Sequence, residues 1–231
     1  MRPGGGPMPP GVPPHPGGPY PGAPYGPPRR GGSGGRKLLG CLFVGVVMVL
    51  LVGVGGYVVY LQRTSHTLST PLSAGGLTRD TDAEANAKET ISRLNTVLSE
   101  ATDYDVQQRV SAIYGTGEEK YLFVGGTGEH DLKYPVQDFN GAVSTAFSGI
   151  EKTIYSPSTV KISDAGGDGV ALSTVLQIQI IGPTGRTTYS TGQLAAWSTR
   201  TTMGIVMRAG RPSESIDLAT VMRNIRKDVE D

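Results

Sequence analysis

Hydrophobic residues concentrate in one long run near the N-terminal end of the chain. The run, Leu38–Leu61, covers 24 positions and contains no charged side chain. As an α-helix with a rise of about 1.5 Å per residue it is about 36 Å long, and the hydrocarbon core of a bilayer is about 30 Å thick. A helix also satisfies its own backbone hydrogen bonds in lipid. The run therefore predicts a single transmembrane helix.

Three later segments repeat apolar residues at helical spacing. Residues 62–79 are small and polar and predict a linker, after which 80–101 predicts a helix capped by Thr81 or Asp82. Its two heptads are few for a coiled coil, so we expect this face to pack on its own domain. A second helix is predicted over 135–150, and a third begins at Ser213 or Ser215. The apolar faces are Ala87, Ile91, Leu94, Leu98 and Ala101; Phe139, Val143, Ala146, Phe147 and Ile150; and Leu218, Val221, Met222, Ile225 and Val229.

Strand patterns lie between these helices. The strongest is 170–181, which is bounded by Gly169 and by a turn at Gly182–Gly185. Residues 106–114 are mixed and show no clear period. Consecutive strands joined by short turns predict an α+β domain over 80–231, with an antiparallel sheet of about four to five strands and helices packed on it. The further predicted strands are 120–125, 152–162, 186–198 and 202–208.

Charge sets the expected orientation of the chain. The tail, residues 1–37, is rich in Pro and Gly, which predicts disorder, and it holds five basic residues and no acidic one. Its basic residues are Arg2, Arg29, Arg30, Arg36 and Lys37. The positive-inside rule then places the tail in the cytoplasm and the C-terminal domain outside. We expect the bilayer to hold Leu38–Leu61 and anionic headgroups to lie near the last four basic residues. The rest of the chain has 16 basic and 20 acidic residues, which does not favour a nucleic-acid partner.

Two alternatives bear on the tail and the span. A cleaved signal peptide has a shorter apolar run than this one and a small-residue cleavage site after it. A lipobox lies at the end of its apolar run, whereas Leu38-Leu39-Gly40-Cys41 lies at the start of this one. Neither alternative is therefore favoured. Cys41, the only cysteine, is either a small apolar residue of the helix or a palmitoylation site. Several PxxP spacings offer docking to an aromatic groove, but they also arise by chance in such a composition, so we favour a flexible extension.

Candidate chemistry is sparse. His15, His66 and His130 are scattered along the chain, so no zinc cluster is predicted. His130-Asp131 would need a serine to form a triad, and no nucleophile-elbow motif is present. Gly125–Gly128 lacks the Lys and Ser/Thr of a phosphate loop and favours a flexible turn. The acidic pairs Glu118-Glu119 and Asp103/Asp105 suit solvated loops more than calcium sites. The sequence therefore predicts a non-enzyme without catalytic, cofactor-binding or metal-binding residues.

The C-terminal half carries three residue patterns that bear on the kind of protein this is. They are Ala195-Ala196-Trp197-Ser198-Thr199, then Thr202-x-Gly204-x-Val206, then Leu218-Ala219-x-x-Met222-Arg223-x-Ile225-Arg226-x-x-Val229-Glu230. With the Pro/Gly/Tyr-rich tail and single span, the chain resembles actinobacterial single-pass membrane proteins that have an uncharacterised extracytoplasmic α+β domain. Relatives of that kind usually have a disulfide-bonded cysteine at the position of Ala195, and the outer part of this chain has none. The resemblance implies a location in the cell envelope and a domain type, and the motifs look like packing motifs.

Three functions remain open on these observations. The one we favour is a non-catalytic binding module, anchored in the membrane, that contacts an envelope protein or ligand outside the cell. The second is a transmembrane sensor that couples the outer domain to the Pro-rich tail. The third is an envelope hydrolase, which needs His130 or a carboxylate pair in a cleft.

Overall fold

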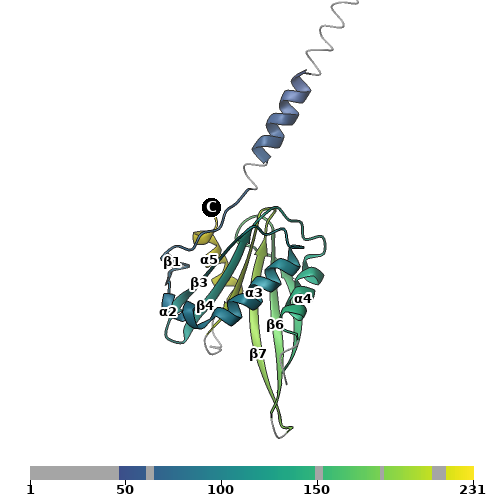
Figure 1. Ribbon diagram of the computed structural model, residues 1–231. Helices are drawn as coiled ribbons and strands as arrows, with labels where there is room; N and C mark the ends of the chain where they lie inside the picture. Colours follow the sequence, from purple (N-terminus) through teal and green to yellow (C-terminus); the bar gives the residue numbers. More distant parts are fainter. Residues whose placement is uncertain (1–46, 61–64, 149–152, 183–184, 210–216) are drawn as a thin grey trace, which may run out of the picture. The chain divides into compact units, whose positions relative to one another are not determined.

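Figure 1 shows a computed structural model of the chain, which describes residues 47–60, 65–148, 153–182, 185–209 and 217–231. Residues 47–60 form a helix whose large apolar side chains are exposed. Within the described residues, no helix combines the length and hydrophobicity that crossing a membrane requires. The predicted span Leu38–Leu61 continues past both ends of this helix, and the predicted tail 1–37 lies outside the described residues. Both stay predictions.

The domain is built on a six-stranded antiparallel sheet in the order β3-β4-β8-β7-β6-β5. The bounds are β3 Gln108–Thr116, β4 Glu119–Thr127, β5 Thr153–Ile162, β6 Val170–Ile181, β7 Thr187–Ser198 and β8 Thr202–Arg208. Strand β3 pairs with β4, and β5 to β8 pair successively, each with the next strand in the sequence. Strand β8 also pairs with β4, so it lies between β4 and β7. The predicted α+β class is confirmed, with six strands instead of four to five.

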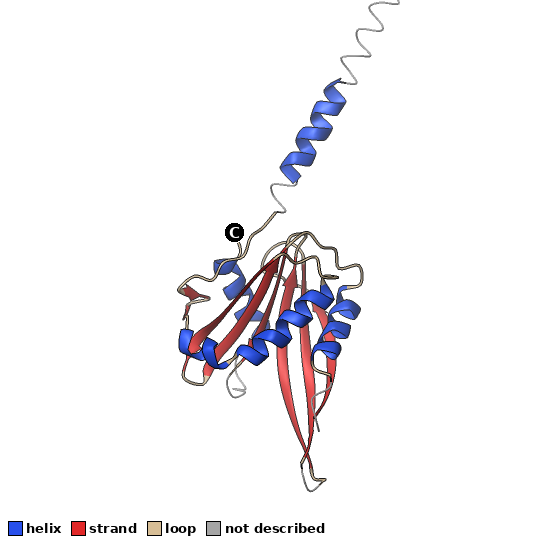
Figure 2. Ribbon diagram, in the orientation of Figure 1, coloured by secondary structure: helices blue, strands red, loops and turns tan. Residues whose placement is uncertain are grey.

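Helices cover both faces of this sheet. Helices α3 (Lys88–Ala101) and α4 (Pro135–Ala146) cross one face, and α5 (Leu218–Val229) packs on the other against β7 and β8 (Figure 2). The first face holds the larger cluster, which includes Leu94, Leu98 and Phe139. The second holds Trp197 and Met222. The described members of each predicted helical face thus pack on the sheet, as their periodicity indicated. The predicted helix 135–150 ends at Ala146, and Ile150 lies outside the described residues.

The predicted helix over 80–101 is two helices, α2 (Thr81–Asn86) and α3, with a break at Ala87. Neither predicted residue caps α2: the side chain of Asp80 accepts from the backbone N–H of Ala83 instead. The break follows from tertiary contacts, because the Glu84 carboxylate of α2 binds the N–H of Ile113 in β3 while α3 crosses the sheet. Likewise α5 starts at Leu218 with Asp217 as its cap, and the two predicted caps, Ser213 and Ser215, lie outside the described residues.

Part of the predicted linker packs on the domain. Residues 73–78 form a two-stranded hairpin, β1 (Ser73–Ala74) and β2 (Leu77–Thr78), and Ala74 is fully buried. Upstream, Thr67 exchanges backbone hydrogen bonds with Asp231, and Ser69 donates one to Val229. The end of α5 is therefore tied to the segment that leads into the domain.

The strand missing from the sequence prediction is β3. Its positions 112–115 are buried in succession, so this part of β3 lacks the alternation of a one-faced strand. The Gly125–Gly128 segment, predicted as a flexible turn, begins inside β4. A Cβ atom on Gly126 would lie 2.3 Å from Val106 Cγ1, and one on Gly128 2.3 Å from the Asp105 carbonyl oxygen. These glycines allow close packing and form no phosphate loop.

Candidate functional site

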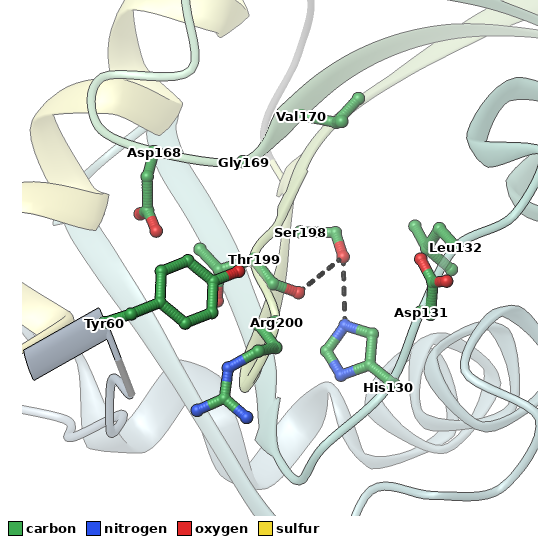
Figure 3. Close-up of a pocket in the computed structure, with 10 residues that line it drawn as sticks. All are labelled: Tyr60, His130, Asp131, Leu132, Asp168, Gly169, Val170, Ser198, Thr199 and Arg200. Atoms are coloured by element: carbon green, nitrogen blue, oxygen red, sulfur yellow. Dashed lines mark hydrogen bonds between the residues drawn. The ribbon is translucent and has the colours of Figure 1, made fainter. Parts of the chain in front are cut away.

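A pocket of about 500 Å³ opens where the end of β7 meets the loop after β4. His130 and Ser198 line it, together with Asp168 and Arg200 (Figure 3). His130 comes from the loop between β4 and α4, and Ser198 is the last residue of β7. The fold thus brings together a histidine and a serine that are 68 residues apart in the sequence.

The imidazole of His130 is held at both nitrogens. Its Nδ1 lies 2.8 Å from the carbonyl oxygen of Gly128, and its Nε2 lies 2.9 Å from Ser198 Oγ. A carbonyl only accepts, so we assign the proton of the neutral ring to Nδ1, and Nε2 then accepts from the serine hydroxyl. Both ring nitrogens are thereby engaged. The third member of the arrangement is the backbone carbonyl of Gly128, and Asp131 does not take the place of an acid in a triad, which the sequence did not favour.

The surrounding loops are fastened to each other by backbone hydrogen bonds. The N–H of Gly128 donates to the carbonyl of Thr201 at 2.9 Å, and the N–H of His130 donates to that of Arg200 at 3.1 Å. Ser198 and His130 are both buried, with relative exposures of 6% and 7%. The serine–histidine contact therefore belongs to a packed junction between two loops. Sequence reasoning named His130 and missed Ser198, because nothing in the local pattern at the end of β7 indicates which residue will face it.

Beside the pocket, a buried arginine joins α5 to the loop between β5 and β6. Arg226 is 2% exposed, and its Nε lies 2.5 Å from Glu230. Its other nitrogens donate to the carbonyls of Ala165 and Asp168 at 3.0 and 2.9 Å and to the Asp168 carboxylate at 3.1 Å. The guanidinium also lies 5.8 Å from the ring centre of Trp197. A buried charge needs this many partners to offset its desolvation.

The three residue patterns of the C-terminal half, at 195–199, 202–206 and 218–230, meet at this arginine. Trp197 Nε1 donates to Glu230 at 3.1 Å, and the Thr202 hydroxyl donates to the same carboxylate. The Trp197 ring stacks on Phe123 and lies over Gly204, where a Cβ atom would be 2.2 Å from the ring. The expectation that these are packing motifs fits this geometry.

A second ionic cluster fixes the corner where α2 meets β3. Arg79 binds both carboxylate oxygens of Glu84, at 2.7 and 2.9 Å. The hydrogen bond from Arg79 lowers the pKa of the Glu84 carboxyl, and the same contact raises the pKa of Arg79. Nearby, the hydrogen bond from Lys120 lowers the pKa of Asp80. Burial raises the pKa of Tyr114 to about 12. These groups stabilise the corner in their charged forms, apart from the tyrosine, which stays neutral.

The remaining sequence candidates do not assemble into a site. Among the described residues, no group of three or more His, Cys, Asp or Glu side chains is placed to hold a metal ion. His66 Nε2 is buried and lies 3.3 Å from a carboxylate oxygen of Asp168, which also binds Arg226. Glu119 begins β4, while Asp103 lies in the turn after α3. We therefore assign no catalytic, cofactor or metal role to these residues.

Among the described residues, no helix lies over one part of the sheet. Ala171 of β6 and Ala195 of β7 face α5, and since side chains alternate, every second residue from them shares that face. Helix α5 packs on β7, β8 and β1, whereas β6 and β7 run on past the helices to a hairpin tip (Figure 1). We call the resulting surface of β5–β7 the open face. Its exposed members are Ser156, Ser158, Val160, Val175, Gln177, Tyr189, Thr191 and Gln193.

Comparisons with protein-family models, with curated proteins and with solved structures found no match for this chain. The fold is of the α+β class, with a six-stranded antiparallel sheet. Helices pack on both faces of this sheet, and among the described residues the open face of β5–β7 has no helix over it.

Proposed function

We propose that the protein is a single-pass membrane protein of the cell envelope whose C-terminal domain is an extracytoplasmic, non-catalytic binding module. The anchor is Leu38–Leu61, and the N-terminal tail is cytoplasmic because Arg29, Arg30, Arg36 and Lys37 precede the anchor. The helical conformation of residues 47–60 and their exposed apolar side chains support the anchor. The proposed partners are the bilayer, anionic headgroups near the four basic residues, and an envelope protein or ligand outside the cell.

The observation that carries the binding role is the open face. A protein surface without a binding role normally carries many charged residues. Charged residues make up 18% of this chain, so they are available to such a surface. Strands β5, β6 and β7 together contain one charged residue, Lys161. A long, uncovered and nearly charge-free sheet surface is instead typical of a contact surface, where desolvating charges would be costly.

The pocket supports the non-catalytic part of the proposal. The hydrogen bond between Ser198 and His130 is one that a catalytic pair also has, so burial is what disfavours catalysis here. Both side chains are buried, and the Ser198 hydroxyl also lies 3.3 Å from the carbonyl oxygen of Thr199. A catalytic serine oxygen must be accessible to a substrate carbonyl. Treatment of the full-length chain with a fluorophosphonate tests this point. Covalent labelling of Ser198 that disappears in His130→Ala would refute a non-catalytic domain, and no labelling at this serine is expected.

Topology and partner capture test the rest. Protease applied to intact cells should remove the domain and spare residues 1–37, and replacing the four basic residues by Gln should weaken this orientation. Fractionation of the full-length chain as a soluble protein would refute the anchor. Crosslinking on intact cells should retain an envelope component, and a Gln177→Glu variant should retain less of it. A variant that retains as much as the wild type would remove the open face from the binding role.

A further inference from the structure

We propose that the open face of β5–β7 binds an uncharged, hydroxyl-rich polymer, a neutral glycan. This inference rests on the proposed binding function and names the chemical class of its ligand. The face is defined by cross-strand rows that the strand register fixes. Ser158 pairs with Val175, which pairs with Gln193; the next row is Ser156, Gln177 and Thr191.

The first argument is chemical complementarity. Hydroxyl groups of Ser and Thr both donate and accept hydrogen bonds, and a Gln amide offers two donors and a carbonyl acceptor. The hydroxyls of a sugar have the same dual character, so a row of such side chains can bind several of them. No Lys, Arg, Asp or Glu belongs to the open face, and therefore it offers no ion pair to a phosphate or carboxylate polymer. A neutral ligand needs no ion pair, so the lack of charged residues does not weaken its binding.

The second argument is the aromatic residue at the far end of the face. Tyr189 is 73% exposed, in a row with Gln179 of β6. A phenol ring this exposed has a flat apolar surface and a polar tip. The C–H groups on one side of a pyranose ring can stack on such a surface while the sugar hydroxyls reach the neighbouring amides. Val175, in the row of Ser158 and Gln193, and Val160, in the row beyond it, are 40% and 56% exposed and provide further apolar contact.

The third argument is size, which disfavours a second copy of the chain as occupant. Strands lie about 4.8 Å apart and alternate side chains about 6.8 Å apart along a strand, so three strands and four rows span about 400 Å². A standard protein–protein interface buries about 800 Å² on each partner. Protein interfaces are also depleted in serine, and two of the exposed members here are serines. A short oligosaccharide stretch fits this area.

Co-sedimentation of the full-length chain in detergent micelles with cellulose, chitin, curdlan and amylose particles tests the proposal. We expect retention on at least one polymer, with little change between about 50 mM and about 500 mM salt, because no charges take part. Tyr189→Ala should weaken retention about tenfold. Tyr134→Ala is the matched control, since Tyr134 is 57% exposed at the start of α4, and it should bind like the wild type.

The outcomes separate this inference from the proposed function. Retention on none of the four polymers, or equal retention of Tyr189→Ala and the wild type, overturns the glycan. A dimer seen by sedimentation velocity and lost in Tyr189→Ala overturns it in favour of a second copy. A third outcome separates the two proposals. If Gln177→Glu loses a protein that the wild type captures by crosslinking, and neither the wild type nor any variant binds a polymer, the binding module is supported and the glycan ligand is refuted. Folding is not at risk in these variants, because the substituted side chains are exposed.

Discussion

Replacing Arg226 with Met should destabilise the domain by about 3 kcal/mol. Met replaces the aliphatic stem of the arginine, so the change mainly removes the guanidinium with its charge, its donors and its contact with the Trp197 ring. The side chain of Glu230 is 6% exposed and would lose its charged partner at Nε. Removing one partner of a buried ion pair costs about 3–5 kcal/mol, because the other charge is left buried.

The surrounding contacts place the expected value at the lower end of that range. Glu230 keeps two other donors, Trp197 Nε1 and the Thr202 hydroxyl. The Asp168 carboxylate has a side-chain exposure of 44% and can bind water once Arg226 is gone. The carbonyl of Ala165 loses a donor inside the loop, at about 1 kcal/mol or more.

The assay is intrinsic fluorescence during thermal unfolding of the full-length chain. Trp197 is the only tryptophan and is fully buried against this cluster, so its emission reports the region directly. At about 2–4 °C per kcal/mol for a domain of this size, a loss of about 3 kcal/mol lowers Tm by about 6–12 °C. The double variant Arg226→Met with Glu230→Gln should recover part of the loss, since no buried carboxylate then remains unpaired. A shift below about 2 °C for the single variant would refute the stabilising role of the arginine.

Three further changes test the packing and the electrostatics. Gly204→Ala drives a Cβ atom into the Trp197 ring and should cost about 2–3 kcal/mol, whereas Gly192→Ala, with contacts of 3.5 Å or more, should be neutral or stabilising by thermal unfolding. The pKa of Glu84 is lowered in the folded state, so its contribution to stability is present above the unfolded-state pKa and is lost as pH falls through the folded-state pKa. In urea titrations, Glu84→Gln should therefore lose less stability than the wild type below about pH 4.5. An unchanged dependence of stability on acid pH would contradict this. His130→Ala should cost about 1–3 kcal/mol by leaving buried partners unsatisfied, and an unchanged Tm would show that the loop junction does not need it.

Elements with a regular local pattern were predictable from the sequence. The strand over 170–181 has the same bounds in the structure as in the prediction, because its apolar run is long and glycines stop it at both ends. Strand β3 was missed, since burial on both faces removes the alternation on which the prediction depends. The break at Ala87 also escaped prediction, because it depends on Glu84 reaching the backbone of Ile113, 29 residues away. Local periodicity carries no information about such a contact.

The candidate site shows the same division more sharply. His130 stood out as one of three histidines, yet its partners are a glycine carbonyl and a serine at the end of a distant strand. The open face is likewise invisible to a local pattern, since it exists only because α5 packs on β7 and β8 and stops short of the hairpin tip. What the sequence does record is the missing charge in 170–181 and 187–198. That absence acquires a meaning only when the strands are placed side by side.

The edge of the sheet bears on what the open face contacts. Strand β5 is the edge strand next to the open face, and an exposed edge is a template for pairing with another chain. Pro157 in its middle has no N–H to donate, and Lys161 adds a charge near its end, so both residues disfavour strand addition along this edge. The domain thus discourages association through the backbone of β5 while leaving the side chains of the adjoining face uncovered. If the proposed binding role holds, a partner of this region would be recognised through hydroxyl, amide and phenol groups, and the strand ladder would take no part in the contact.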